Sequence, residues 1–418
     1  MTAANRLVDY LRHQGKGLLK PIYSGPVITV AGAWRRRGLR RTRFIGITGS
    51  AGKTTTKDML YEVLAANFPS ARSHDSNNQL YDVARTLVGV SPRARYCLQE
   101  IGASEPGGLD PMLALLQPHV GIVTNVGEDH YKSFRGPDAV AAEKGKLVAC
   151  LPPDGIAVLN ADDARVMQMA SSTRARVVTF GVANGAALRA ESIVSQWPAR
   201  LTLRVRWNDE VVEVHTGLNG RHLAGCVMAV LATACELGVP LRSAARSIEG
   251  FRPHTARMSV LETAGGITFL RDDFKAPWWS LPSSIEFVAQ AKVQRKTIVL
   301  GTISDYGGNA RGIYRRAAAL ALEAADQVLV IGERARSLEK HFSATAGGRL
   351  RGFATVQEAA AHLHSTARRG DFILLKGSLS DHLSRIALVF DRRVNCWLRT
   401  CKRTIFCERC HLLTTRQP

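Results

Sequence analysis

The chain has 418 residues, of which 45% are hydrophobic, and its mean hydropathy is −0.06. This length suggests two or three domains, and this composition excludes a largely disordered protein. The 56 Lys and Arg residues outnumber the 35 Asp and Glu residues and give a net charge of +21, which raises nucleic acids and anionic lipids as partners. No nucleic-acid motif accompanies this charge, so we expect no nucleic-acid partner.

Residues 1–43 form a basic N-terminal segment. Leu7 and Leu11 predict a short helix, the apolar stretch Val27–Trp34 follows, and an arginine cluster spans residues 35–43. We expect this cluster to be a solvated surface, with peripheral contact to an acidic substrate, membrane surface or polyanion as the alternative. No apolar run reaches the roughly 18 residues of a transmembrane segment, and no signal peptide opens the chain. We therefore expect a cytoplasmic protein.

From Phe44 onward, apolar strands alternate with helices, a pattern typical of a parallel α/β sheet. The expected strands of this first block are Phe44–Thr48, Tyr96–Ile101, Val120–Asn125 and Ile156–Leu159. The expected helices are Thr54–Asn67, Pro137–Cys150 and Leu223–Glu236, and Leu201–Thr216 is expected as an antiparallel edge segment.

A second α/β block follows Pro253, after a Gly- and Pro-containing stretch that suits a hinge. Its expected strands are Ile267–Leu270, Thr297–Leu300, Gln327–Ile331 and Asp371–Leu375, and its expected helices are Arg311–Ala325 and Val356–Arg368. We therefore divide the chain into a lead over 1–43, a central domain over 44–252, a C-terminal domain over 253–395 and a tail over 396–418.

The segment from Thr48 to Thr55 reads as a phosphate-binding loop between a strand and a helix. The members of this loop are Thr48, Gly49, Ser50, Ala51, Gly52, Lys53, Thr54 and Thr55. Its glycines allow backbone N–H groups to surround phosphate oxygens, and the helix N-terminus adds a positive dipole end. Lys53 would neutralise the charge of the β- and γ-phosphates, and Thr54 would offer its hydroxyl to Mg²⁺.

This loop resembles the phosphate loop of the Mur ligases, Ile-Thr-Gly-x-x-Gly-Lys-Thr-Thr, and the resemblance extends from Phe44 to Phe390. It implies an α/β fold: a central P-loop parallel-sheet ATPase domain plus a C-terminal Rossmann-like α/β domain. In this resemblance, Glu100 takes the place of the family's Mg²⁺-binding glutamate. His130 ends a segment like Asn-x-x-x-Asp-His and supports the metal, and Lys144 takes the place of a carbamylated lysine that binds a second Mg²⁺.

Further matches imply nucleotide and substrate contacts. Asn160 and Asp162 belong to an Asn-Ala-Asp segment that implies cofactor binding. Arg257 matches a Gly-Arg between domains, and Asp273 and Lys275 match an Asp-Ser-Lys-Ala loop. The resemblance implies that domain closure brings these three residues onto the nucleotide. Residues of the D-alanyl-D-alanine-adding branch that imply substrate binding are Asn78, Lys376 and Ser378.

The implied activity is ATP-dependent amide-bond formation. With ATP and Mg²⁺, a small-molecule carboxylate would become an acyl-phosphate and then react with an amino acid or peptide acceptor. Two alternatives are a Mur-like ATP-binding or regulatory protein without ligase chemistry, and a P-loop ATPase that works on nucleic acid. Acceptor-dependent ADP release separates the first alternative from a ligase. Nucleic-acid binding that weakens steeply with salt would indicate the second alternative.

The sequence departs from the family pattern in three places. Asn78 lies in an Asn-Asn-Gln run that matches the D-alanyl-D-alanine-adding branch, but the Gly-Val-Pro that follows it in that branch is missing here. Residues 1–43 replace the domain that grips a UDP-sugar in the peptidoglycan ligases, so we expect a substrate other than a UDP-muramoyl peptide. The family's His-Asn-x-x-Asn helix start retains His222, a cofactor-binding candidate, but its first asparagine is Leu223 here. We therefore expect adenine to be contacted differently.

Four cysteines crowd the tail: Cys396, Cys401, Cys407 and Cys410. Four thiolates can hold Zn²⁺ tetrahedrally, and the spacing of Cys407 and Cys410 is conventional for such a site. The alternatives are a reduced basic tail and a redox dithiol.

Overall fold

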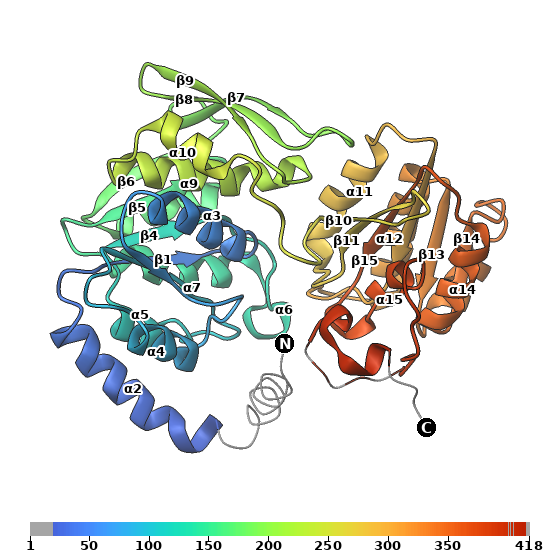
Figure 1. Cartoon of the computed structure of the whole chain (residues 1–418), viewed down its shortest axis with the longest axis horizontal. Helices are drawn as coiled ribbons and strands as arrows, with labels where there is room; N and C mark the ends of the chain where they lie inside the picture. Colours follow the sequence, from blue (N-terminus) through green and yellow to red (C-terminus); the bar gives the residue numbers. More distant parts are fainter. Residues whose placement is uncertain (1–19, 400, 402, 404, 415–418) are drawn as a thin grey trace. The chain divides into compact units, whose positions relative to one another are not determined.

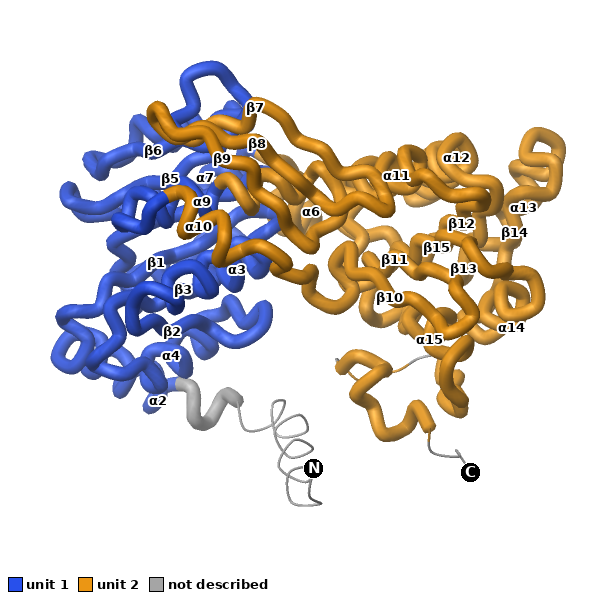
Figure 2. The backbone as a smooth tube through the Cα atoms, turned by 45° about the horizontal axis from the view of Figure 1, so that its top comes forward, with its two compact units in different colours: residues 1–126, 138–187, 229–240 blue, residues 127–137, 188–228, 241–418 orange. Residues whose placement is uncertain are grey.

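The computed structural model describes residues 20–399, 401, 403 and 405–414, with side chains from residue 25 onward. The chain divides into two compact units, each built from several segments (Figure 2). Unit 1 comprises Met1–Val126, Asp138–Ala187 and Ala229–Pro240, and unit 2 comprises Gly127–Pro137, Leu188–Met228 and Leu241–Pro418. The short helix expected near Leu7 and Leu11 lies outside the described residues.

Unit 1 contains a parallel sheet with the strand order β2-β3-β1-β4-β5-β6 (Figures 1 and 2). These strands are β1 (Arg43–Thr48), β2 (Ser70–Arg72), β3 (Tyr96–Glu100), β4 (Val120–Val123), β5 (Ile156–Asn160) and β6 (Arg176–Gly181). Because β1 lies between β3 and β4, the polar groups that follow these three strands are brought to one edge of the sheet.

Helices accompany the strands of unit 1 because parallel strands need crossover connections. They are α2 (Lys20–Arg37), α3 (Lys53–Ala65), α4 (Leu80–Val88), α5 (Asp110–Leu116), α7 (Pro137–Ala149), α8 (Ala164–Gln168) and the 3₁₀ turn η1 (Met169–Ser172). Apolar residues of α2, α4 and α5, among them Ala31, Leu87 and Leu116, pack in one core with Phe44 and Cys97 of the sheet. The α7 residue Val148 packs instead with Leu159 of β5.

The arginine cluster at the end of α2 is only partly solvated. Arg35 is 8% exposed, and its guanidinium donates to the carbonyl oxygens of Leu116 and Gln117 over 2.9 and 3.0 Å. It also lies 4.1 Å from the centroid of the Phe44 ring. The expectation of a solvated surface is therefore wrong at Arg35, which fastens α2 to the rest of unit 1.

Unit 2 contains a second sheet, in the order β10-β11-β15-β12-β13-β14 (Figures 1 and 2). Its strands are β10 (Ser259–Glu262), β11 (Thr268–Asp272), β12 (Arg295–Leu300), β13 (Gln327–Ile331), β14 (Leu350–Phe353) and β15 (Asp371–Lys376). All neighbouring pairs are parallel except β10 with β11. Phe372 and Leu374 join one apolar core, whereas Ile373 and Leu375 join another, so both faces of the sheet are covered.

The helices of unit 2 are α6 (Tyr131–Phe134), α10 (Leu241–Ile248), α11 (Leu281–Ala289), α12 (Ala310–Ala324), α13 (Ala335–Phe342), α14 (Val356–Thr366) and α15 (Ser384–Leu388). The last five of them provide the two covers. The 3₁₀ turns of this unit are η2 (Arg221–Leu223), η3 (Trp278–Ser280), η4 (Leu379–Asp381), η5 (Cys407–Arg409) and η6 (His411–Leu413). Core residues of α11, α12 and α13 lie on one face of the sheet, and those of α14 and α15 lie on the other.

A three-stranded antiparallel ribbon also belongs to unit 2: β7 (Leu188–Val194), β8 (Thr202–Trp207) and β9 (Glu210–His215). The expected edge segment Leu201–Thr216 is therefore two strands joined by a tight turn, in which Asn208 has a positive φ of 52°. Helix α9 (Ala224–Glu236) begins close to its expected position.

The predicted fold class is confirmed, with α/β sheets in the central and C-terminal parts of the chain. No helix in the described part of the chain is long and apolar enough to cross a membrane.

Candidate active site

The phosphate loop joins β1 to α3 and adopts backbone angles that favour glycine. Gly49 has φ 145° and Gly52 has φ 80°. A Cβ atom on Gly49 would lie 1.9 Å from Thr124 Oγ1, so this position excludes any side chain. Gly52 is the N-cap of α3, which places the N–H groups of the first turn at the loop, as a phosphate site requires.

The Thr124–Asn125 pair after β4 holds this loop in place. The Ser50 N–H donates to the carbonyl oxygen of Asn125 over 3.0 Å, and the Ala51 N–H donates to Asn125 Oδ1 over 2.9 Å. Thr124 Oγ1 donates to the Ala51 carbonyl oxygen over 2.6 Å. The sequence pattern placed these residues in a family segment but did not reveal that they support the loop.

Lys53 and Thr54 begin α3, and their side chains lie at the loop. Lys53 Nζ donates to the Gly49 carbonyl oxygen over 2.6 Å, so its ammonium group lies over the loop backbone. Thr54 is 3% exposed, and its Oγ1 lies 3.0 Å from Ser76 Oγ. Thr55 is also buried, at 6% exposed.

Glu100, at the end of β3, is fixed by hydrogen bonds to both oxygens of its carboxylate. Thr54 Oγ1 donates to Oε2 over 2.7 Å, and Asn78 Nδ2 donates to Oε1 over 3.0 Å. Glu100 itself is 1% exposed. The structure therefore places Asn78, predicted to bind substrate, beside the predicted metal ligands Thr54 and Glu100.

The oxygen atoms of this group fit Mg²⁺, a hard cation that prefers carboxylate and hydroxyl ligands. Thr54, Glu100 and the neighbouring Ser76 supply such oxygens within one hydrogen-bonded cluster. A buried carboxylate is costly without a compensating positive charge or hydrogen bonds. Bound Mg²⁺ would add this charge beside the phosphate loop.

Two buried lysines lie in the helices of unit 1. Lys144 of α7 is 4% exposed, and its carbamylation stays a prediction. Lys57 of α3, which sequence reasoning missed, is fully buried and donates to the carbonyl oxygens of Ser73 and Asp75 over 2.7 and 2.5 Å. Burial lowers the pKa of Lys57, although the charges of Asp58 and Glu100 act against this.

The predicted cofactor residues after β5 support loops in unit 1. Asn160 Nδ2 donates to the Thr124 carbonyl oxygen over 2.8 Å. The Asp162 carboxylate accepts from the N–H groups of Val182 and Ala183, each over 2.9 Å. Their nucleotide contacts stay predictions, but Asn160 is linked directly to the residue that supports the phosphate loop.

In unit 2, the predicted residues His130 and Lys275 lie in one charged cluster. Lys275 Nζ is 2.9 Å from Asp129 Oδ1 and 3.0 Å from Asp305 Oδ2. His130 Nε2 is 3.7 Å from Asp129 Oδ1. Asp129, His130 and Asp305 have ligand atoms within 4.8 Å of one another, and Lys275 offers the positive charge that a metal ion would otherwise supply. Asp305 was missed in the sequence, although polar residues after strand ends often mark such sites.

The backbone of this cluster is unusual. His130 and Asp305 both have φ 49°, a left-handed conformation that non-glycine residues adopt uncommonly. Two hydrogen bonds join the loops on either side of Lys275 and Asp305: Ser304 N–H to the Ala276 carbonyl oxygen and Trp278 N–H to the Ser304 carbonyl oxygen, each 2.8 Å. These bonds hold Lys275 beside Asp305. Backbone strain of this kind concentrates at functional sites.

The carboxyl ends of β11 and β15 carry a second ion pair. Asp272 and Lys376 are register partners in adjacent parallel strands, and Lys376 Nζ lies 2.5 Å from Asp272 Oδ2. Ser284 Oγ also donates to Asp272 Oδ2, over 2.7 Å. Burial alone would raise the pKa of Asp272, but the Lys376 charge and these hydrogen bonds outweigh it and lower that pKa. His222 interacts electrostatically with both members of the pair.

Asp273 and Arg257 take different places around this strand end. Asp273 is 2% exposed and accepts two hydrogen bonds from Arg271, each 3.1 Å, and burial raises its pKa. The Arg257 guanidinium lies 4.3 Å from the centroid of the Phe274 ring. Positive φ angles flank Arg257 on both sides, at Ala256 and Met258.

Ser378, after β15, caps the short turn η4. Its N–H donates to Asp381 Oδ2 over 2.8 Å, and Asp381 also accepts from the Thr302 N–H over 2.8 Å. Ser378 therefore orders the loop that follows Lys376, and its role in substrate binding stays a prediction.

The structure thus groups the predicted site residues within each unit. Unit 1 brings together the phosphate loop, Glu100 and Asn78, and unit 2 holds two ion-paired clusters around Lys275 and Lys376. The catalytic and binding roles assigned to these residues stay predictions.

Two protein-family models match the chain. The model of the Mur ligase middle domain matches residues 47–234. The model of the Mur ligase glutamate ligase domain matches residues 256–379.

The curated relatives carry a common name, UDP-N-acetylmuramoyl-tripeptide–D-alanyl-D-alanine ligase. The protein from Mycobacterium tuberculosis (strain ATCC 25618 / H37Rv) is 29% identical over 365 residues, which cover 82% of this chain and 72% of the relative. The protein from Escherichia coli (strain K12) is 25% identical over 370 residues, which cover 87% of this chain and 80% of the relative. These names conflict with the expectation of a substrate other than a UDP-muramoyl peptide.

Solved structures show the same fold. A crystal structure of MurF from Acinetobacter baumannii superposes with a TM-score of 0.77 at 22% identity and covers 87% of this chain and 79% of its own. The structure of MurF ligase from Thermotoga maritima in complex with ADP gives a TM-score of 0.74 at 19% identity, with coverage of 87% and 83%.

Proposed function

This chain belongs to the Mur ligase family of ATP-dependent ligases that form C–N bonds, and we propose that it joins a carboxylate donor to a dipeptide. The proposed pair is the one named for its relatives, a UDP-N-acetylmuramoyl-tripeptide and D-alanyl-D-alanine. The observation that carries the ligase site is the double hydrogen bond of Glu100, with Thr54 and Asn78 on its two oxygens beside the phosphate loop.

The proposed reaction has two steps. A carboxylate oxygen of the donor attacks the γ-phosphorus of ATP, the bond from that phosphorus to the bridging oxygen breaks, and ADP leaves. The acceptor amine then attacks the carbonyl carbon of the acyl-phosphate. The C–O bond to phosphate breaks, the nitrogen loses a proton, and inorganic phosphate leaves with one donor oxygen.

The residues of unit 1 would position and neutralise the phosphates. The N–H groups at the start of α3 and the Lys53 ammonium meet at the Gly49–Gly52 turn, where they would hold the β- and γ-phosphates. Thr54 and Glu100 would hold Mg²⁺, which supplies positive charge to the phosphate oxygens when bound. Preorganised charges of this kind provide most of the rate enhancement in phosphoryl transfer.

Asn78 supports a further part of this proposal. Its amide nitrogen occupies one oxygen of Glu100, so its amide oxygen can accept a hydrogen bond from a substrate group. By accepting from an N–H or O–H group of the donor, Asn78 would help to position the donor carboxylate next to the phosphate that it attacks. Such positioning converts a slow bimolecular reaction into a fast one between held groups.

Carbamylation of Lys144 belongs to the same proposal. A carbamate on this buried side chain would add two oxygens and remove a cation, which suits a second Mg²⁺. Removal of dissolved carbon dioxide should therefore lower activity reversibly in the wild type. Lys144→Ala should be inactive, whereas Lys146→Ala, on the same helix and ion-paired with Asp110 at the surface, should keep full activity and the same response. Full activity of Lys144→Ala would contradict the carbamate.

The first test measures phosphate release from the full chain with ATP, Mg²⁺, the proposed donor and D-alanyl-D-alanine. Release that requires both substrates and disappears in Lys53→Ala would support the proposal. A panel of other peptidyl carboxylates and amino acids would show whether another pair is preferred. ATP binding without release for any pair would favour the regulatory alternative, which the replacement of a family asparagine by Leu223 keeps open.

A further inference from the structure

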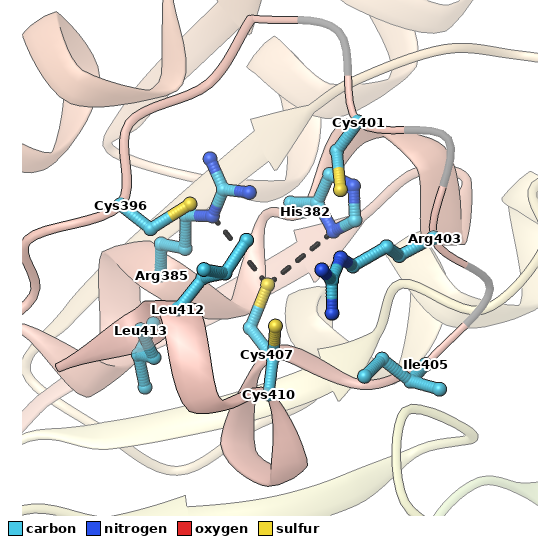
Figure 3. A pocket seen from close by; sticks show the side chains of 10 residues that line it. All are labelled: His382, Arg385, Cys396, Cys401, Arg403, Ile405, Cys407, Cys410, Leu412 and Leu413. Carbon is cyan, nitrogen blue, oxygen red and sulfur yellow. Dashed lines mark hydrogen bonds between the residues drawn. The ribbon is translucent and has the colours of Figure 1, made fainter. Parts of the chain in front are cut away.

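The C-terminal tail builds a sulfur-rich cavity against the rest of unit 2. Four cysteines reach into it, together with His382 and Arg385 from the turn before α15 and from α15 itself (Figure 3). Those cysteines are Cys396, Cys401, Cys407 and Cys410. The cavity measures about 10 Å³, close to the lower limit for one water molecule. It therefore suits a single coordinated ion and excludes an organic ligand.

The cavity has the turn that two thiolate ligands need. Cys407 begins η5 and Cys410 is its C-cap, and the Cys410 N–H donates to the Cys407 carbonyl oxygen over 3.1 Å. The Arg409 N–H closes the same turn on the Phe406 carbonyl oxygen over 3.0 Å. A C-x-x-C turn of this kind can place both sulfur atoms on one ion.

The groups around Cys407 suit a thiolate in a metal site. His382 Nδ1 lies 3.3 Å from Cys407 Sγ, and Arg385 Nε donates to the same sulfur over 3.4 Å. His382 and Arg385 are 4% and 2% exposed. Four thiolates around a divalent ion carry two net negative charges, and buried N–H donors with a guanidinium charge would offset them.

The tail has little else to hold it in one conformation. Two tail residues, Cys407 and Leu413, are buried in a small apolar cluster with Leu388 and Val394. The regular structure of the tail in the described residues is limited to η5 and η6. Small segments with so few buried apolar residues usually need a crosslink. None of the eight cysteines, all of which lie in the described residues, forms a disulfide.

We propose that Cys396, Cys401, Cys407 and Cys410 bind one Zn²⁺ ion, which folds the tail onto the segment that follows β11. Among the described residues, only Asp129, His130 and Asp305 place three possible ligand atoms within 4.8 Å of one another. No three of the sulfur atoms in the described part of the tail lie that close together, so a bound ion would draw them closer. His382 lies beside Cys407, where it could donate a hydrogen bond to the Cys407 sulfur or bind the ion in place of one cysteine.

Contacts of the tail give the ion a role at the candidate site. Glu408, inside the C-x-x-C turn, is ion-paired with Arg271, the same residue that holds both oxygens of Asp273. The ring of Phe406 lies 6.2 Å from that of Phe274, centroid to centroid. Zn²⁺ would thus act as a positioning element for the Arg271–Asp273 pair, through Glu408 and Phe406.

The test uses the full chain purified without chelator and measures metal by mass spectrometry of the elements. We expect about one zinc per chain in the wild type and in Cys150→Ser, whose thiol lies outside the tail. Cys407→Ser and Cys410→Ser should lose zinc at least about tenfold. After Co²⁺ replacement, the wild type should show the absorption of thiolate-bound cobalt. A wild type that holds no zinc after incubation with Zn²⁺ and reductant, or one that contains a Cys407–Cys410 disulfide, would overturn the site.

Hydrogen exchange tests the positioning role separately. Removal of zinc by a chelator should accelerate amide exchange in peptides that cover 268–276, whereas a peptide of β13 should keep its rate. Glu408→Gln should accelerate exchange in 268–276 while keeping zinc, and therefore separates positioning from metal binding. Unchanged exchange in 268–276 after complete removal of zinc would overturn the positioning role.

Discussion

Thr54 Oγ1 donates a hydrogen bond to Glu100 Oε2 over 2.7 Å. This bond joins the hydroxyl that follows the loop lysine to the carboxylate at the end of β3, although 46 positions separate them. The parallel pairing of β1 with β3 brings the two residues together. Two of the predicted Mg²⁺ ligands of unit 1, Thr54 and Glu100, therefore form one buried group, on which the first prediction rests.

Glu100→Gln should lower kcat/KM by about 100-fold or more, because it removes the negative charge that holds Mg²⁺ while keeping the shape of the side chain. The Mg²⁺ concentration for half-maximal activity should rise. Steady-state phosphate release across a Mg²⁺ titration measures both effects. Glu105→Gln, a change at an exposed residue, is the control. Unchanged Mg²⁺ dependence in Glu100→Gln would show that Glu100 does not hold the metal.

Gly49→Ala should abolish ATP binding and destabilise the protein by about 1–3 kcal/mol. The new Cβ would lie 1.9 Å from Thr124 Oγ1, at a backbone φ of 145°. Calorimetric titration with ATP and thermal unfolding measure the two losses. Gly136→Ala should change neither, since a Cβ there has no neighbour within 4 Å among the described residues. If Gly49→Ala bound ATP as tightly as the wild type, the claim that the loop has no room for a side chain at Gly49 would be wrong.

Lys376→Met should reduce the free energy of unfolding by about 3–5 kcal/mol near pH 7, since it leaves the Asp272 carboxylate buried without its partner. In the wild type, the Asp272 pKa is lowered, so the stabilisation is present above the ordinary carboxyl pKa and is lost as pH falls through the folded-state pKa. In the variant, burial should raise the pKa of Asp272. The stability deficit, which is the difference in the free energy of unfolding between the wild type and the variant, should therefore shrink as pH falls.

Urea unfolding at about pH 7 and about pH 5 measures this deficit. Lys340→Met removes an exposed lysine of α13 and should change stability little at either pH. A deficit for Lys376→Met that stays constant or grows as pH falls would contradict the ion pair.

Lys275→Met should lower kcat/KM at least about tenfold, because it leaves Asp129 and Asp305 without the ammonium that neutralises them. Lys275→Arg, which keeps the charge, should retain most of the activity. Burial alone would lower the pKa of Lys275, but the two carboxylates outweigh it and raise that pKa. Lys275 should therefore stay charged over the working range, and a loss of activity between about pH 7 and pH 9 that disappears in Lys275→Arg would contradict this.

The sequence was sufficient to predict the parts of the fold that rest on strong local patterns. The strands around the phosphate loop and the helix after it lie within one or two residues of their expected ends. Here the apolar run, the two glycines of the loop and the start of the helix all predict the same boundaries. Short or exposed elements, such as β2 (Ser70–Arg72) and β14 (Leu350–Phe353), were missed because their residues carry no clear period.

The arrangement of the site could be predicted only in part. Motifs identified Glu100, Asn78 and Lys376, but the pairing of Glu100 with Asn78 and of Lys376 with Asp272 depends on strand order, since neighbouring parallel strands place their carboxyl ends side by side. Asp305 and Glu408 carry no motif, and their ion pairs with Lys275 and Arg271 depend on long-range folding. The burial of Arg35 likewise depends on where α2 packs, which the charge pattern does not reveal.

Transfer of an oxygen atom tests the proposed ligase reaction most directly. The donor carboxylate would be labelled with ¹⁸O and incubated with ATP, Mg²⁺, D-alanyl-D-alanine and the full chain, and mass spectrometry would follow both the phosphate and the condensed product. An acyl-phosphate route predicts one ¹⁸O atom in each phosphate released and a product that retains the other. Unlabelled phosphate, or labelled donor that is never condensed while ATP is consumed, would contradict a ligase that works through an acyl-phosphate.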